Sequence, residues 1–117
     1  MDESELIELV QKAIGLHETS LCLEFVNESL VRRLRNDAVL QLVGTPREIR
    51  SLLVWSVLAG ATIDCRRETR EEYQDRREFW FRVRVPVAGH AQPLFYELEL
   101  TDDDKDLPSV AILNVHF

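Results

Sequence analysis

The 117-residue chain is acidic, with 21 Asp and Glu residues against 14 Lys and Arg and a formal net charge of -7. With 45% hydrophobic residues, it suits one globular domain, residues 1–117, able to fold without disulfides or metal. The most apolar stretch, LLVWSVLAGA (52–61), is about half the roughly 20 residues of a membrane span, and the amino terminus is acidic where a secretion signal is basic. We therefore expect a cytoplasmic protein with no membrane partner.

The charges are distributed unevenly. All twelve arginines lie in residues 31–85, whose net charge is +4, whereas residues 1–30 carry −6 and residues 86–117 carry −5. Such a block either forms a positive surface for a polyanionic partner or pairs with interleaved acids, as in RRETREEYQDRRE (66–78). We favour the pairing, because runs of charge usually face solvent. The conformation of 66–78 stays open.

The amino-terminal third predicts two helices. The first runs from about residue 4 to 14, with an apolar stripe, acids in its first turn and Gly15 as its stop. The second covers about 27–35, and residues 20–26 stay open between helix and strand. AVLQLV (38–43) predicts a short strand.

The clearest local signal is a capping box. The side chains of Thr45 and Glu48 can each accept a hydrogen bond from the other residue's backbone amide, and Pro46 suits the first helical position. The helix is expected to reach about Leu58 and to end at Gly60. Its core-facing stripe consists of Ile49, Leu52, Leu53, Ser56 and Val57, so that Trp55 lies outside it.

Beyond residue 60 the hydrophobic period becomes two, which predicts strands at about 61–66, 79–87, 94–101 and 110–117. In the first hairpin, pairs that sum to 181 place Val83 opposite Leu98 and give ion pairs Arg84–Glu97 and Arg82–Glu99. In the second, a sum of 211 aligns Leu98 with Leu113, Tyr96 with Val115, Glu97 with Asn114 and Phe95 with His116. The fold class is therefore α+β, with N-terminal helices packed on an antiparallel sheet of about four strands in chain order.

Metal and cofactor sites are not predicted. Asp102, Asp104 and Asp106 have the opening spacing of a calcium loop, but Leu107 replaces its glycine and Leu113 its bidentate glutamate. The two cysteines lack ligand spacing and are interpreted as small buried hydrophobes. We expect the acidic run to be a charged hairpin loop.

One face of the predicted sheet is a candidate catalytic site because it gathers polar side chains. The two registers place six polar residues together: Arg82, Arg84, Glu97, Glu99, Asn114 and His116. Arginine there could hold a phosphate while glutamate or histidine moves a proton. The interpretation we favour is an ordinary face with salt bridges, because clustered ionisable residues are only statistical markers of a site.

The order of helices and sheet, REIRSLLVWSVLAGATIDCRRE (47–68) and the ending PLFYELEL…VAILNVHF resemble the barnase, colicin and RelE-type group of small ribonucleases over residues 28–117. The resemblance implies metal-independent, toxin-type RNA cleavage with a neighbouring ribose hydroxyl as nucleophile. It implies catalytic roles for Arg82, Arg84, Glu97 and His116, and phosphate contacts from Arg32, Arg33 and Arg67. The chain departs from that group because it is acidic and has only two lysines. This difference concerns RNA affinity, because proteins bind the RNA backbone chiefly through positive charge.

The segment DAVLQLVGTPREIRSLL (37–53) is similar to the cone-shaped family typified by nuclear transport factor 2, in which helices close over a curved sheet. That resemblance implies a binding module or a pocket enzyme. The alternative to a ribonuclease is accordingly a non-catalytic interaction or immunity-like module. Its contact surfaces would be the acidic ends and the edge strands, and its partner an antitoxin or immunity protein or a second copy of the chain.

Overall fold

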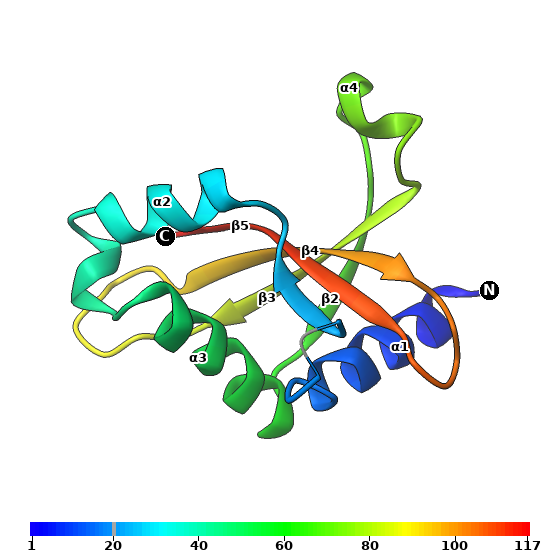
Figure 1. Ribbon diagram of the computed structural model, residues 1–117, viewed down its shortest axis with the longest axis horizontal. Helices are drawn as coiled ribbons and strands as arrows, with labels where there is room; N and C mark the ends of the chain where they lie inside the picture. Colours follow the sequence, from blue (N-terminus) through cyan, green and yellow to red (C-terminus); the bar gives the residue numbers. More distant parts are fainter. Residues whose placement is uncertain (20) are drawn as a thin grey trace.

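The computed structural model describes residues 1–19 and 21–117 and has an α+β fold in which one sheet carries helices mainly on one face (Figure 1). The helices are α1 (Glu3–Gly15), α2 (Glu28–Asn36), the short 3-10 helix η1 (Leu40–Leu42), α3 (Pro46–Leu58) and the one-turn α4 (Glu71–Gln74). The strands are β1 (Leu23–Phe25), β2 (Ile63–Arg67), β3 (Phe79–Val85), β4 (Leu94–Asp102) and β5 (Ser109–His116), and they lie side by side in the order β1-β5-β4-β3-β2.

The first two helices confirm the sequence prediction. The carboxylate of Asp2 accepts a hydrogen bond from the Glu5 amide (2.9 Å), which starts α1, and the Asn27 side chain accepts one from the Leu30 amide (2.9 Å), which starts α2. Gly15 is the last residue of α1, and Leu16 caps the helix. Within the open segment 20–26, residues 23–25 form β1, and residue 20 lies outside the described part of the chain.

The predicted strand at 38–43 is wrong, because this segment forms the turn of η1. The Asp37 carboxylate accepts hydrogen bonds from the amides of Val39 (2.9 Å) and Leu40 (3.0 Å). The amides of Val43 and Gly44 then both donate to the Leu40 carbonyl. An aspartate before an apolar run thus offered the backbone a local alternative to strand pairing.

The capping box and α3 are confirmed. The Glu48 amide donates to the Thr45 hydroxyl (3.2 Å), and the Thr45 amide donates to the Glu48 carboxylate (3.1 Å). The helix ends at Leu58, and Gly60 turns the chain with a φ of 101° that favours glycine. Trp55 points to solvent, with 66% of its surface exposed.

The sheet differs from the predicted antiparallel sheet of about four strands because β1 adds a fifth, parallel strand. Strands β2 to β5 form the expected antiparallel series. Strand β1 joins the outer edge of β5, where the Val110 amide donates to the Cys22 carbonyl (2.8 Å) and the Val26 amide donates to the Ile112 carbonyl (2.9 Å). A three-residue strand is too short to show a hydrophobic period.

The predicted register of the first hairpin is wrong by two residues. Val83 lies opposite Tyr96, Arg82 opposite Glu97 and Arg84 opposite Phe95. The last pair is Val85 with Leu94, so Pro86 and Pro93, which have no amide to donate, both fall outside the ladder. Because the shift is even, every side chain keeps its predicted face.

The predicted register of the second hairpin is correct at its open end and wrong nearer the loop. Tyr96 lies opposite Val115 and Glu97 opposite Asn114, but Leu98 lies opposite Ile112 rather than Leu113. The bulge at Leu113 turns Val110 and Ile112 into the core. Both faces of this strand are apolar in sequence, so the pattern could not locate the bulge.

The core lies between the sheet and α1, α2 and α3, whereas α4 stands apart from these helices, in the connection between β2 and β3 (Figure 1). At its centre, fully buried Tyr96 donates a hydrogen bond of 2.6 Å to the Ile49 carbonyl of α3. Burial raises the pKa of this hydroxyl, which therefore stays a neutral donor. Among the described residues, no helix is long and apolar enough to cross a membrane.

Tyr96→Phe should lower the free energy of unfolding by about 1 kcal/mol, because it removes one buried hydrogen bond without emptying the core. Urea unfolding followed by circular dichroism measures the change. Tyr73→Phe, a half-buried position on α4, is the matched control and should leave stability unchanged. Equal stability of Tyr96→Phe and the wild type would contradict this role.

Candidate functional site

Three of the four predicted catalytic residues lie together on the sheet face opposite the helices. Arg82 of β3, Glu97 of β4 and His116 of β5 line a shallow hollow of about 300 Å³, with Trp80 and Phe95 as its aromatic walls. Arg84, the fourth, is not among the residues that line it. Side chains alternate between the two faces along each strand, so these polar residues lie on one face although the predicted register of the first hairpin is wrong.

Glu97 is already held by several neighbours. Its carboxylate accepts a hydrogen bond from the Asn114 amide group (3.2 Å) and lies 3.4 Å from Nε2 of His116 and 3.6 Å from a guanidinium nitrogen of Arg70. The His116 ring also stacks on Phe95, with 5.6 Å between ring centroids. The arrangement orients the histidine beside a carboxylate, which is the geometry of an acid–base pair as well as of an ordinary surface ion pair.

The two sheet arginines do not form their predicted ion pairs. Arg82 and Arg84 both approach the same carboxylate oxygen of Asp64 on β2, at 3.4 and 3.6 Å, instead of Glu99 and Glu97. The two-residue change of register removes the predicted partners, and the neighbouring edge strand supplies Asp64. These guanidinium groups are consequently partly neutralised.

The predicted phosphate contacts do not gather at one place. Arg33, on α2, donates to the Asn114 side chain and to the Val115 carbonyl. Arg67 pairs with Glu78 at 3.3 Å and lies over the Phe79 ring, whereas Arg32 is exposed on α2. Arg33 and Arg67 therefore make contacts within the fold and do not form a common phosphate site.

The charged run 66–78 forms a partly buried ion network beneath α4. The Glu68 side chain, 1% exposed, accepts hydrogen bonds from Arg70 (3.0 and 3.1 Å) and Arg77 (2.8 Å). Arg77, 7% exposed, also lies 3.3 Å from the buried carboxylate of Glu99. Burial alone would raise the pKa of Glu68, but the hydrogen bonds from both arginines outweigh it and lower that pKa. The predicted pairing of arginines with acids thus attaches the segment that contains α4 to the sheet.

Arg77→Met should lower the free energy of unfolding by about 3 kcal/mol or more, because it leaves the Glu68 and Glu99 carboxylates buried without their shared cation. Arg67→Met is the matched control, since its pair with Glu78 is exposed and should contribute less than about 1 kcal/mol. Thermal and urea unfolding measure both variants. A small effect in both would show that the network is dispensable.

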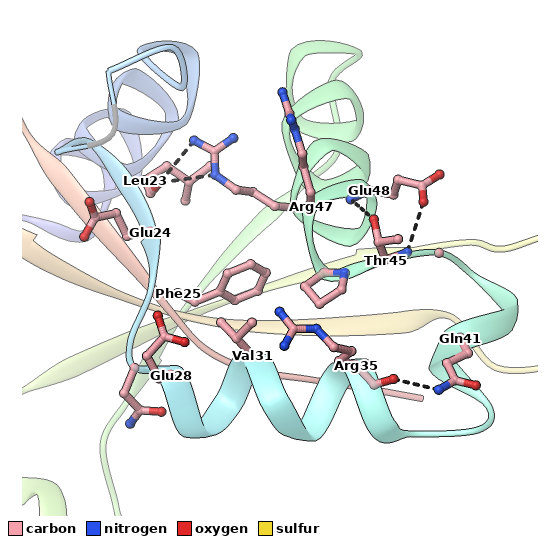
Figure 2. A pocket seen from close by; sticks show the side chains of 14 residues that line it. Leu23, Glu24, Phe25, Glu28, Val31, Arg35, Gln41, Thr45, Arg47 and Glu48 are labelled. Atoms are coloured by element: carbon pink, nitrogen blue, oxygen red, sulfur yellow. Dashed lines mark hydrogen bonds between the residues drawn. The ribbon is translucent and has the colours of Figure 1, made fainter.

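A larger hollow lies elsewhere, in a region that the sequence interpretation did not select. A groove of about 1080 Å³ lies between β1, α2, the turn before α3 and the first turn of α3. Its apolar floor includes Phe25, Val31 and Pro46. In Figure 2, Phe25 reaches into the space between α2 and α3. We call this the β1–α3 groove.

Arg50 holds one wall of the β1–α3 groove. Its guanidinium donates to the Leu23 carbonyl from two nitrogens (3.2 and 3.1 Å) and to the His17 carbonyl (2.7 Å). Burial, and then the nearby charge of Arg47, lower the pKa of Arg50. These contacts connect α3 to β1, so Arg50 has a structural role in the groove.

Two other arginines of the β1–α3 groove have free charges. Neither Arg35 nor Arg47 forms an ion pair with any residue in 1–19 or 21–117. Arg35 projects from α2 toward the middle of the groove, and Arg47 extends from the first turn of α3 along its rim (Figure 2). Glu24 and Glu28 lie at the β1 end, so the groove has a cationic side and an acidic end.

The groove is lined by three neighbouring stretches of the chain, residues 23–31, 35–41 and 44–50. No sequence pattern links them. The closest available signal was the excess of arginine in residues 31–50, which carry five arginines and two acids. Only the packing of α2 against β1 and α3 turns that excess into a site.

Comparisons with known proteins add no relative: no family model matches the chain, and no curated protein or solved structure is significantly similar to it. Among the described residues, no cluster of three or more His, Cys, Asp or Glu could hold a metal ion. The functional proposal accordingly depends on the geometry of the β1–α3 groove and the polar sheet face.

Proposed function

We propose that this protein is a non-catalytic interaction module that binds an acidic, partly apolar segment of a protein partner in the β1–α3 groove. The observation that carries the proposal is the pair of uncompensated cations, Arg35 and Arg47, beside an apolar floor. Other arginines, such as Arg70, Arg77 and Arg82, already have carboxylate partners. The groove is thus a place where unpaired positive charge lies beside an apolar surface.

The chemistry of the groove suits a peptide with two kinds of side chain. Guanidinium groups bind carboxylates through paired, charge-assisted hydrogen bonds. An apolar side chain that leaves water on the floor formed by Phe25, Val31 and Pro46 would contribute about 1.5–3 kcal/mol when fully buried. Together the two interactions select acidic residues next to an apolar residue.

The same residues argue for binding rather than catalysis. The Glu48 carboxylate is occupied by the capping box, and the hydrogen bonds from Thr45 lower its pKa. Within 1–19 and 21–117, the residues that line the groove include no histidine, cysteine or serine. Pairs of histidine with serine or cysteine, which supply an activated nucleophile in many enzymes, therefore have no candidate among these described residues.

A ribonuclease activity on the polar sheet face stays a second prediction. The gathering of Arg82, Glu97 and His116 around one hollow favours it. The pairing of both Arg82 and Arg84 with Asp64 weighs against it, because RNA binding needs cations whose charge is available to phosphate. We therefore prefer the interaction module.

Binding in the groove is tested with a fluorescein-labelled peptide of sequence DDLDD and fluorescence anisotropy. Arg35→Glu combined with Arg47→Glu should weaken binding at least about tenfold, since each charged hydrogen bond contributes about 1.5–3 kcal/mol. Arg32→Glu combined with Arg66→Glu changes the net charge equally outside the groove and should bind like the wild type.

Two results would contradict the interaction module. Equal weakening in the groove variant and the matched variant would mean that the peptide is attracted by overall charge alone. Equal binding of DDSDD and DDLDD would mean that the apolar floor takes no part.

The ribonuclease prediction has its own assay. If the sheet face is catalytic, the purified protein cleaves single-stranded RNA without added metal, and His116→Ala and Arg82→Ala each abolish cleavage. Arg66→Ala, on the exposed end of β2, should retain it. Intact RNA after prolonged incubation with folded wild-type protein would exclude this function.

A further inference from the structure

The loop between β4 and β5 is an ordered acidic turn. The Asp104 carboxylate accepts hydrogen bonds from the amides of Asp106 (2.8 Å) and Leu107 (3.1 Å), and the Asp102 carboxylate accepts one from the Asp104 amide (2.9 Å). The hydrogen bonds to Asp104 lower its pKa, so it is ionised at neutral pH. The turn is therefore preformed, and little conformational entropy would be lost when it binds.

The same loop presents unused acids beside an exposed leucine. The carboxylates of Asp103 and Asp106 accept no hydrogen bond and form no ion pair with the rest of the described chain. Leu107 is 47% exposed, although the adjacent Pro108 is buried. This combination of carboxylates and one apolar side chain is the ligand chemistry that the β1–α3 groove selects.

The loop and the groove lie at opposite ends of the molecule. In Figure 1 the β4–β5 loop is at the right, beside the amino terminus, whereas α2 and the start of α3 are at the left. The molecule measures 38 Å along this axis. The loop therefore cannot reach the groove of its own molecule, but it is free to enter that of another.

Resting on the proposed function of the groove, we infer that its partner is a second copy of this chain, whose β4–β5 loop it binds. Asp103 and Asp106 of one molecule pair with Arg35 and Arg47 of the next, and Leu107 covers the apolar floor. Because two different surfaces meet, the contact is head to tail and generates chains or closed rings rather than a symmetric dimer.

The contact is small and electrostatic, so it is expected to be weak and sensitive to salt. At about 0.1 M salt the Debye length is about 10 Å, and at about 1 M it is about 3 Å. In sedimentation velocity, the average mass of the wild type should rise with concentration above the 13.6 kDa of one chain at the lower salt, and should return to it at the higher salt.

Two complementary variants give the decisive measurement. The groove variant, Arg35→Glu with Arg47→Glu, keeps a normal loop, and the loop variant, Asp103→Asn with Asp106→Asn, keeps a normal groove and has no charge that could pair with the reversed groove. Each alone should stay monomeric, whereas a mixture should form a 1:1 dimer, because only one functional loop and one functional groove can meet. Glu8→Lys with Glu72→Lys, which reverses two exposed acids elsewhere, should assemble like the wild type.

The outcomes separate this inference from the proposed function. If the wild type is monomeric at every concentration while DDLDD still binds the groove, the second-copy partner is wrong and the interaction module stands. Assembly that survives in both variants, or a mixture that stays monomeric, also overturns the inference. If DDLDD fails to bind and the wild type still assembles through other residues, both proposals fail.

Discussion

The parallel pairing of β1 with β5 is the contact on which the functional architecture depends. The ladder between β1 and β5 is flanked by backbone hydrogen bonds from Val110 to Cys22 and from Val26 to Ile112, and together they hold a three-residue strand at the edge of the antiparallel sheet. This places α2 next to the end of β5 and leaves a space between α2 and α3, whose wall Arg50 secures. The groove is thus a product of how one short strand is anchored.

The arginines serve two distinct purposes. Arg70 and Arg77 are held by buried or half-buried carboxylates under α4, where removing one partner would leave a charge uncompensated. Arg35 and Arg47 keep their charge available beside the groove. The groove therefore has a cationic side in an acidic protein, while the unpaired carboxylates of the β4–β5 loop lie at the opposite end of the long axis.

The parts that sequence reasoning predicted well depend on local signals. The Thr45–Glu48 capping box and the apolar stripes located α1, α2 and α3 closely. The predicted register of the first hairpin was wrong because a shift of two residues leaves every side chain on the same face of the sheet. Only the prolines at the end of the hairpin distinguish the two registers. The bulge at Leu113 and the pairing of β1 with β5, which sets one side of the groove, depend on contacts between distant segments. Arg82, Glu97 and His116 were brought together correctly because strand parity alone determines their face.

The guanidinium of Arg50 has a consequence for aggregation. Since Cys22 and Val26 direct their backbone hydrogen bonds toward β5, the Leu23 carbonyl points to the free edge of the sheet, where Arg50 occupies it. An open edge is a template for uncontrolled strand addition between molecules. The arginine occupies the Leu23 carbonyl, so this part of the edge is closed to the main-chain hydrogen bonds that any extended segment can supply, while the side chains around it stay accessible.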